Sequence, residues 1–381
     1  MDNKHIPFNW PHMTGKELFY IAESHFNGCL AGDGPFTKRC HRWLEQRTGC
    51  DMALLTHSCT AALEMTALLL DIQPGDEIIM PSYTFVSTAN AFVLRGGVPV
   101  FVDIRKDTLN LDERLIEAAI TPRTRVIVPV HYAGVACEMD SILSIARQHH
   151  LYVVEDAAQS VMASYNGRAL GSLGDFGTYS FHETKNVISG EGGALLVNNT
   201  EFATRAEIIR EKGTDRSRFF RGEVSKYRWQ DIGSSFLPGE LIAAFLWAQL
   251  EEADRMTQQR LASWQRYHDL TKPLESSGLL RRPIIPDNCQ HNAHMYYVLL
   301  NPEINRSDVL ETFQANDICS VFHYVPLHST PAGRRYARTH GTLKVTNSLS
   351  SQLIRLPLWT DITDQQQNRV IDVLKKAIEK K

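Results

Sequence analysis

Short apolar runs alternate with longer amphipathic segments through the first half of the chain. The apolar runs predict strands at Met52–His57, Glu77–Met80, Val98–Val102, Arg125–Val130, Leu151–Val154, Phe176–Phe181 and Ala194–Val197. The amphipathic segments predict helices at Thr60–Leu70, Thr84–Leu94, Asp112–Ala119, Met139–His149 and Glu201–Glu211. Strands and helices that alternate with short turns are typical of right-handed βαβ units. The pattern therefore predicts an α/β fold with a mostly parallel seven-stranded sheet and flanking helices.

The chain changes character after a long helical segment that runs from Glu240 to Leu270. Residues 281–286 are rich in Pro and Arg, and short strands are predicted at Met295–Leu300 and Cys319–Tyr324. We predict a large domain with an N-terminal arm over residues 1–250, and a smaller C-terminal α+β domain over residues 251–381.

The composition is that of an ordinary globular protein, with 43% hydrophobic and 22% charged residues among 381. The 40 Lys and Arg residues nearly balance the 43 Asp and Glu residues, so the formal net charge is −3. This balance gives no support to binding of nucleic acid or of an anionic membrane. No apolar run reaches the roughly 18–20 residues that span a bilayer. Met1–Trp10 lacks the apolar stretch of a secretory signal.

The cysteines favour reduced thiols, because the seven are scattered and include no CxxC pair. No clustered spacing typical of a zinc site is present either. We therefore expect a cytoplasmic protein with no metal site and with neither nucleic acid nor membrane as a partner.

Polar residues follow two of the predicted strands, at the edge of a parallel sheet where ligands bind. The small, hydroxyl-bearing stretch Thr56–Ala61 opens a helix, and free N–H groups at a helix start favour a phosphate. Simple capping by Ser58 or Thr60 is the alternative. Asp156 ends a second strand, where a buried carboxylate needs a cationic partner. It is either the counter-ion of a protonated ligand nitrogen or the cap of a helix beginning near Ala157.

Lys185 follows a third strand and precedes the glycine-rich stretch Gly190–Gly193. A solvated surface lysine is the ordinary alternative. An amine beside a phosphate-binding turn, with a carboxylate on a neighbouring strand end, suits pyridoxal 5′-phosphate. That cofactor needs a lysine for its covalent link, an Asp for its pyridine nitrogen and a cradle for its phosphate.

Four stretches together carry a resemblance that runs over essentially the whole chain. They are Pro81–Phe85, Glu155–Gln159, Ser180–Lys185 and Glu191–Gly193. With them the chain resembles the DegT/StrS family of sugar-nucleotide aminotransferases, which have the aspartate-aminotransferase-like fold of fold type I pyridoxal phosphate enzymes.

The resemblance implies a role for each of several residues. Lys185 would form the covalent link to the cofactor and move protons, and Asp156 would pair with the pyridinium nitrogen. The implied cofactor-binding set is Thr60, Ala61, Phe85, Asp156, Gln159, Ser180, Lys185 and Ser235. In this set Thr60, Ala61 and Ser180 would hold the phosphate. Core packing of Phe85, surface exposure of Gln159 and a structural role for the Ser180 hydroxyl stay open.

One stretch departs from the family pattern. Many relatives carry Gly-x-Asn-x-Arg before the long helix, and there the Asn reaches the cofactor phosphate of the partner subunit. Here the stretch is Gly233–Leu237, so Ser235 stands in the place of the Asn and Leu237 in the place of the Arg. The resemblance also implies a substrate-binding set of Gly32, Asp33, His323, Tyr324 and His328. Surface aromatic and histidine residues are the alternative for the last three.

Three further stretches are similar to family members of enterobacterial common antigen synthesis: Ala31–Gly34, Val130–Asp140 and Asp231–Ser235. They imply amine transfer from L-glutamate to C4 of a dTDP-4-keto-6-deoxy-D-hexose, giving dTDP-4-amino-4,6-dideoxy-D-galactose, in a homodimer with shared active sites. The gluco epimer and transfer at C3 stay open, as does a non-enzymatic regulator. A sugar 3-dehydratase has His in place of the lysine, so Lys185 argues against it.

Overall fold

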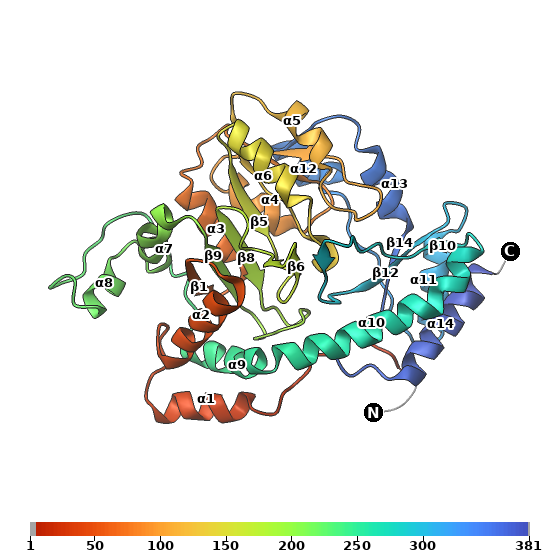
Figure 1. Ribbon diagram of the computed structural model, residues 1–381, viewed down its shortest axis with the longest axis horizontal. Coiled ribbons are helices and arrows are strands. Elements are labelled where there is room, and N and C mark those ends of the chain that lie inside the picture. Colours follow the sequence, from red (N-terminus) through yellow and green to blue (C-terminus); the bar gives the residue numbers. More distant parts are fainter. Residues whose placement is uncertain (1–4, 380–381) are drawn as a thin grey trace.

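Eight strands form the largest sheet of the computed structural model, which describes residues 5–379 (Figure 1). Their order is β1 (Met52–Thr56), β9 (Gly193–Val197), β8 (Phe176–Ser180), β5 (Tyr152–Asp156), β4 (Thr124–Ile127), β2 (Glu77–Pro81), β3 (Val98–Val102) and β13 (Arg338–Thr339). Strand β9 is antiparallel to both neighbours, and the other pairs are parallel. The predicted α/β fold is confirmed. The seven predicted strands are present, and the two-residue β13 adds an eighth at the edge.

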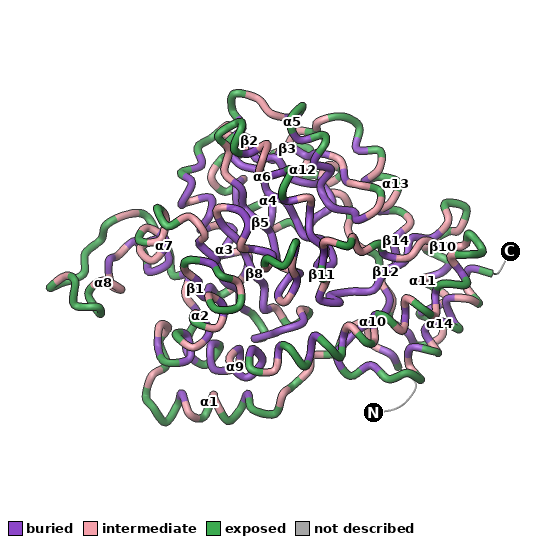
Figure 2. The backbone as a smooth tube through the Cα atoms, viewed as in Figure 1, coloured by how far each residue is buried: buried purple, intermediate pink, exposed green. Residues whose placement is uncertain are grey.

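Helices cover both faces of this sheet. They are α2 (Pro35–Thr48), α3 (Cys59–Leu69), α4 (Val86–Val93), α5 (Ile116–Ala119), α6 (Met139–Gln148), α7 (Ala203–Arg210) and α9 (Glu240–Glu251). Successive strand side chains pack on opposite faces: Leu54 joins the cluster of α3 and α4, and Leu55 joins that of α2 and α9. Figure 2 shows the buried sheet between its exposed covering helices. Burial on both faces explains why these strands are continuous apolar runs.

The C-terminal part builds a second core around a small sheet. Its strands are β10 (Leu280–Arg281), β12 (Tyr296–Leu300) and β14 (Leu353–Leu356), and the helices α10 (Ala253–Ser276), α11 (Arg306–Ala315) and α14 (Asp364–Ile378) contribute to the core. The prediction of a strand at Cys319–Tyr324 is wrong. Only Val321 pairs with β14, at Arg355, because the chain then leaves the sheet edge to carry His323 and Tyr324 into a cavity.

The remaining elements are short or peripheral. They are α1 (Glu17–Phe26), α8 (Arg216–Phe220), α12 (Pro331–Tyr336), α13 (Lys344–Gln352), and the three-stranded sheet of β11 (Cys289–Gln290), β6 (Ser164–Tyr165) and β7 (Arg168–Ala169). Over residues 5–379, the chain has no helix with the length and apolar character needed to cross a membrane.

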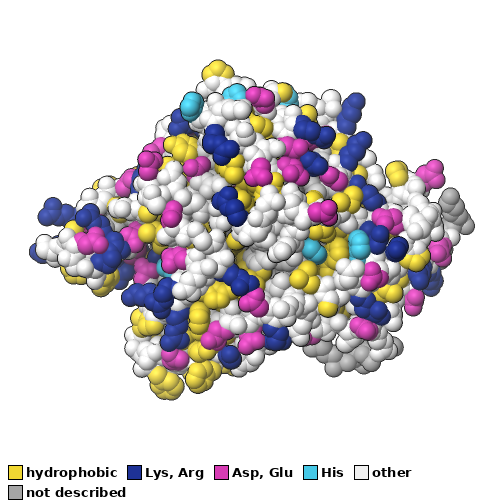
Figure 3. Space-filling view, in the orientation of Figure 1, with side chains coloured by type: hydrophobic (Ala, Val, Ile, Leu, Met, Phe, Trp, Pro, Cys, Tyr) yellow, Lys and Arg dark blue, Asp and Glu magenta, His cyan; other side chains and the backbone are white. Residues whose placement is uncertain are grey.

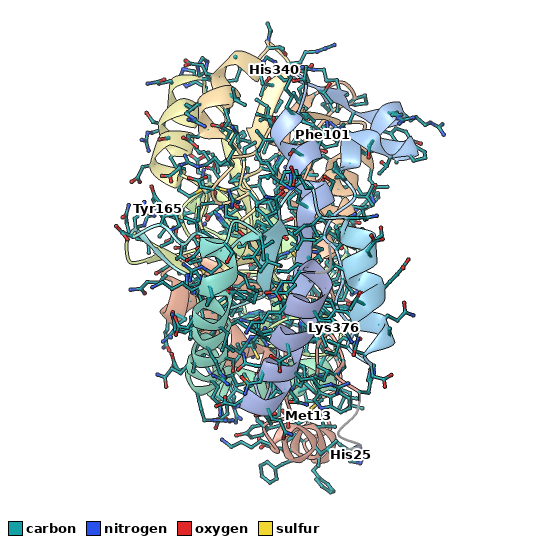
Figure 4. The ribbon with its side chains drawn as sticks, turned by 90° about the vertical axis from the view of Figure 1, so that its right-hand side faces the viewer. Met13, His25, Phe101, Tyr165, His340 and Lys376 are labelled. Carbon is teal, nitrogen blue, oxygen red and sulfur yellow. The ribbon has the colours of Figure 1, made fainter. Side chains whose placement is uncertain are left out.

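The C-terminal part also contributes to the large sheet. Arg338 and Thr339 of β13 pair with β3, and the His340 N–H donates to the Phe101 carbonyl (2.8 Å). Figure 4 shows His340 and Phe101 at one end of the molecule, far from Met13 and His25. The Arg338 guanidinium also pairs with the buried Glu77 carboxylate (2.6 Å). A division into two domains at residue 250 therefore stays a prediction.

Candidate active site

A cavity of about 560 Å³ opens where β5 and β8 end. Its lining brings together eight of the predicted site residues: Thr60, Phe85, Asp156, Gln159, Ser180, Lys185, His323 and Tyr324. The large sheet and its loops supply the first six, and a C-terminal segment supplies the last two. We call this space the Lys185 cavity. Its volume is in the range of small-molecule sites.

Lys185 lies in the tight turn that joins β8 to β9. Its backbone N–H donates to the His182 carbonyl (2.9 Å), and the Ser189 N–H closes the same turn onto the Phe181 carbonyl (2.7 Å). Burial lowers the pKa of Lys185 below its ordinary value, although Cys59 and Asp156 act in the opposite direction. An ammonium group that loses its proton more readily becomes a better nucleophile and base. Lys185 is therefore not a solvated surface lysine, which was the alternative from the sequence.

Asp156 is the last residue of β5 and is only 5% exposed. One carboxylate oxygen accepts a hydrogen bond from the Thr88 hydroxyl (2.7 Å), and the other accepts from the Ala158 N–H (3.2 Å). The residues that follow form a turn, so Asp156 does not cap a helix beginning near Ala157. The carboxylate is held in place and faces the same cavity as Lys185.

The start of helix α3 forms another part of the lining. Ser58 is the N-cap and accepts from the Ala61 N–H (3.0 Å), so the capping alternative is correct for Ser58. The N–H groups of Cys59 and Thr60 have no partner within residues 5–379. The Thr60 hydroxyl bonds to that of Ser87 (2.7 Å). The cap leaves other N–H groups free for an anion, so capping by Ser58 does not exclude the predicted phosphate site. Ala61 is outside the lining, and its implied phosphate contact stays a prediction.

Glycine is required where β9 passes this helix start. A Cβ atom on Gly193 would lie 2.4 Å from the Cys59 backbone nitrogen, which is closer than real Cβ contacts allow. The glycine-rich stretch after Lys185 therefore serves to bring the strand and the helix start together.

Phe85 and Gln159 are placed on the cavity surface. Phe85 is 58% exposed at the start of α4, so the core-packing alternative does not hold. The Gln159 amide is buried and fixed at both ends: its oxygen accepts from the Ala133 N–H (2.7 Å), and its nitrogen donates to the Tyr324 hydroxyl (3.0 Å). Gln159 is thus not an exposed helix residue. Contact of either side chain with the cofactor stays a prediction.

The opposite side of the cavity comes from the C-terminal part: His294, His323, Tyr324 and Arg355. The Tyr83 hydroxyl donates to the His323 carbonyl, and the Tyr132 hydroxyl bonds to the His323 ring (3.1 Å). Burial lowers the pKa of His294 and of His323 well below the ordinary value, and the charges of Lys185 and Arg355 add to this. Both imidazoles are therefore neutral at physiological pH.

Sequence reasoning missed Arg355, His294 and Thr88. Arg355 interrupts the apolar run Leu353–Leu358, and a single charge within such a run was the available signal. His294 and Thr88 stand in unremarkable contexts, and nothing in the sequence marks them.

Four predicted residues lie elsewhere. Gly32 and Ser235 line a second cavity of about 420 Å³, together with Lys212, Arg216 and Tyr227. The Asp33 carboxylate pairs with the buried Arg210 (2.7 Å). The two ring nitrogens of His328 are engaged by Ser82 (2.7 Å) and Asn347 (3.0 Å). Within one chain these four residues do not reach the Lys185 cavity, and their roles stay predictions.

The donor set of the cavity fits pyridoxal 5′-phosphate. Lys185 can form the covalent link, Asp156 offers a fixed carboxylate for the pyridine nitrogen, and the unpartnered N–H groups at the start of α3 suit a phosphate. This set on an α/β sheet is that of a fold type I pyridoxal phosphate enzyme.

Comparison with known proteins makes the class more specific. Residues 11–375 match the DegT/DnrJ/EryC1/StrS aminotransferase family, and the chain belongs to this family. It is a sugar aminotransferase that depends on pyridoxal 5′-phosphate and uses an amino donor and a keto-sugar nucleotide acceptor.

Three similar proteins illustrate the likeness. An uncharacterized protein of Methanocaldococcus jannaschii is 35% identical, over 91% of this chain and 90% of its own. GDP-perosamine synthase of Caulobacter vibrioides is 32% identical, over 97% of each. The protein Spr1654 of Streptococcus pneumoniae, solved in its PMP form, superposes with a TM-score of 0.91 at 25% identity. That match covers 99% of this chain and 100% of the other.

Proposed function

We propose that this enzyme transfers the amino group of L-glutamate to C4 of dTDP-4-keto-6-deoxy-D-glucose, giving dTDP-4-amino-4,6-dideoxy-D-galactose. The observation that carries amine transfer is the placement of Lys185 and Asp156 in one cavity, with burial lowering the pKa of Lys185. A lysine at this position disfavours the sugar 3-dehydratase. The complete set also disfavours a regulator without catalytic activity.

Each residue of the site has a separate role in the proposed reaction. Bound pyridoxal phosphate supplies an aldehyde that takes up the amine and a ring that accepts electron density when the donor Cα–H bond breaks. Asp156 would supply a negative charge to the ring nitrogen, which keeps that nitrogen protonated and positively charged. The Lys185 nitrogen accepts the proton from the donor Cα and later gives a proton to C4 of the sugar. The Cys59 and Thr60 N–H groups anchor the phosphate.

The exchange balances over the two half-reactions. The amino acid loses its amine and one hydrogen and becomes a 2-oxo acid. The keto carbon of the sugar gains the amine and one hydrogen, and its oxygen leaves as water. One water enters in the first half-reaction, so none is consumed overall.

The choice of sugar rests on the sequence resemblance. Lys185 delivers its proton from one side only, so the face of C4 that the sugar presents decides between the galacto and gluco products. The three stretches at 31–34, 130–140 and 231–235 support the galacto product and C4 over C3. GDP-perosamine synthase is named for a GDP sugar, so the nucleotide carried by the substrate of this enzyme has to be determined by experiment.

We also propose a homodimer. The segment around α8 projects from the body of the chain (Figure 1), and Phe220 and Trp229 on it are 68% and 81% exposed. Basic side chains gather over α8 in Figure 3. Exposed aromatic residues on a projecting segment are typical of contact surfaces. A second copy would cover them and bring Gly32 and Ser235 toward the partner's cofactor. A fully active monomer at micromolar concentration would contradict this.

The test is incubation of the holoenzyme with L-glutamate and a panel of 4-keto and 3-keto sugars carrying dTDP, UDP or GDP. We expect turnover with dTDP-4-keto-6-deoxy-D-glucose and an axial C4 amine in the NMR spectrum of the product. An equatorial amine or turnover with only a 3-keto sugar would overturn the substrate assignment, as would a strict need for another nucleotide.

A further inference from the structure

His294 is a buried imidazole in the wall of the Lys185 cavity, and the proposed reaction gives it no role. Its backbone is fixed on both sides. The His294 N–H donates to the Asn292 side-chain oxygen (3.0 Å), and the His294 carbonyl accepts from the Arg260 guanidinium (2.9 Å). Arg260 belongs to α10, is itself buried, and also donates to the Ala293 carbonyl (3.1 Å). The position of the ring in the cavity wall is thus well defined.

One hydrogen bond fixes which nitrogen of the ring carries a proton. Asn186 directly follows Lys185 in the chain, and its side chain is buried. The Asn186 side-chain nitrogen donates to the Asn292 carbonyl (2.7 Å), which can only accept, so the side-chain oxygen is the atom that faces His294. That oxygen also only accepts, and it lies 3.1 Å from His294 Nδ1. Nδ1 is therefore the protonated nitrogen.

The surroundings keep the other ring nitrogen, Nε2, unprotonated. Burial lowers the pKa of His294 well below its ordinary value. Four basic groups on different elements around the ring lower that pKa further: Lys185, Arg355, Arg260 and His323. A neutral imidazole with its proton on Nδ1 has a lone pair on Nε2. The His294 ring is thus a hydrogen-bond acceptor in the cavity wall.

Lys185 is the neighbour that can donate to this acceptor. Within residues 5–379 the His294 ring is hydrogen-bonded only to Asn186, and the Lys185 amine has no hydrogen bond. Both residues line the Lys185 cavity, and both also line an adjoining space of only about 10 Å³. Residues that border so small a space lie next to each other. The effect of the Lys185 charge on the pKa of His294 agrees with this.

We propose that His294 is a positioning residue for Lys185, and that its Nε2 atom accepts an N–H of the Lys185 amine while that amine is free of the cofactor. A primary amine has two N–H groups and one lone pair. Holding one N–H therefore aims the lone pair that takes up the substrate proton. Lys185 moves a proton in both half-reactions, so His294 serves both. This inference rests on the proposed function in one respect, the role of Lys185 as proton carrier.

Two substitutions separate the two ring nitrogens. In His294→Asn the amide nitrogen takes the place of Nδ1, so the bond to Asn186 is kept and the acceptor at Nε2 is lost. In His294→Gln the amide oxygen takes the place of Nε2, so the acceptor is kept and the bond to Asn186 is lost. A role limited to supporting the turn through Asn186 would make His294→Gln the more damaging change. The proposal requires the opposite order.

The two half-reactions of the holoenzyme are measured by rapid mixing. The PLP form is mixed with L-glutamate, or with whichever amino acid the wild type uses, and the PMP form is mixed with the wild type's keto sugar. In His294→Asn we expect both rate constants to fall at least about tenfold, as for a lost hydrogen bond to a charged group. In His294→Gln both should stay within about threefold of wild type, because the acceptor is still present.

The cofactor-free protein gives a readout that needs no turnover. Uptake of pyridoxal phosphate requires the neutral amine, so the pH dependence of the uptake rate reports the pKa of Lys185. An acceptor bonded to the ammonium group stabilises the charged form and raises this pKa. The midpoint of uptake should therefore lie at lower pH in His294→Asn than in wild type, and His294→Gln should restore it. An unchanged or raised midpoint in His294→Asn would overturn the inference.

His291→Asn is the matched control. His291 lies in the same segment and accepts from the Ala293 N–H through Nδ1 (3.2 Å), but it does not line the cavity. Both half-reactions and the uptake midpoint should be unchanged in it.

Three outcomes would contradict the role of His294 itself. They are normal half-reactions in His294→Asn, a larger loss in His294→Gln than in His294→Asn, and a loss confined to one half-reaction. The last would assign Nε2 to the substrate of that half-reaction. Borohydride labelling of a lysine other than Lys185 in the wild type would instead overturn the proposed function.

Discussion

The two walls of the Lys185 cavity differ in how fully their charged groups are paired within the protein. On the wall formed by the large sheet, the Asp156 carboxylate already accepts two hydrogen bonds, and Ser58 caps α3. On the wall formed by the C-terminal part, two imidazoles are neutral, and Arg355 has no anionic partner among residues 5–379. The carboxylate of the sheet wall is thus paired within the protein, whereas the C-terminal wall carries one cation that is not.

Removing Lys185 should have the largest effect on the sheet wall. Lys185→Ala loses the nucleophile and the proton carrier together, so we expect turnover to fall on the order of 10⁴-fold or more. Borohydride should fix the cofactor to the wild-type peptide that contains Lys185, and the visible spectrum should change in the variant. Label on another lysine, or an unchanged spectrum, would remove the assignment.

Asp156→Asn should come next. The amide cannot stabilise the ring-nitrogen proton by charge, so we expect turnover to fall about 10²–10³-fold while the fold stays intact. Circular dichroism and the two half-reactions would be measured side by side. Both half-reactions should slow together. Near-normal turnover would exclude this electrostatic role.

Glu77 tests the ion pair with Arg338 that attaches β13 to the large sheet. Hydrogen bonding from Arg338 holds the pKa of Glu77 at about 2, below its ordinary 4.5. Glu77→Gln should lower the free energy of unfolding by about 2 kcal/mol at neutral pH. Because the folded-state pKa is depressed, this difference is present above pH 4.5 and should vanish as the pH falls toward 2.

Urea unfolding of both proteins across this pH range measures the difference. Arg123→Gln removes the exposed partner of the same carboxylate and should lower the free energy of unfolding much less than Glu77→Gln does. A difference that is independent of pH would rule out the charge-based account.

Thr88→Val should have a smaller effect on the rate. The hydroxyl orients the Asp156 carboxylate (2.7 Å), and a hydrogen bond to a charged group contributes enough to slow turnover about tenfold when lost. Thr84→Val is the control, since Thr84 bonds to Thr88 and not to Asp156. Equal effects of the two substitutions would show that packing alone matters.

The smallest expected effect is on the pH dependence of cofactor reconstitution, through the charge of Arg355 near Lys185. Burial lowers the pKa of Lys185, and Arg355 lowers it further. Reconstitution of the cofactor-free protein needs the neutral amine, so its rate should rise with pH to a midpoint below 10.5. Arg355→Met should move that midpoint upward, because a neighbouring positive charge is gone. A downward shift would show that Arg355 does not act on Lys185 electrostatically.

The sequence could predict the sheet wall and little of the opposite wall. Asp156 and Lys185 follow strong apolar runs, so their place at one sheet edge follows from βαβ geometry. Arg355 stands in a four-residue strand, and its position depends on contacts with Phe8 and Val321, which are far away in the chain. The apolar residues near Tyr324 have the pattern of a strand. The Tyr324 ring instead packs against the buried Tyr83 ring, with 5.6 Å between the ring centroids. Such non-local contacts have no local pattern.

The pairing of β13 with β3 has a mechanical consequence. The C-terminal part is joined to the large sheet by the chain at α9 and α10, and again by β13 and the Glu77–Arg338 pair. Because of these two attachments, a hinge motion of the C-terminal part relative to the large sheet would have to break backbone pairing at the sheet edge. We therefore expect the aperture of the site to change little. An amino donor and a much larger sugar nucleotide would then pass in turn through an opening of nearly constant shape.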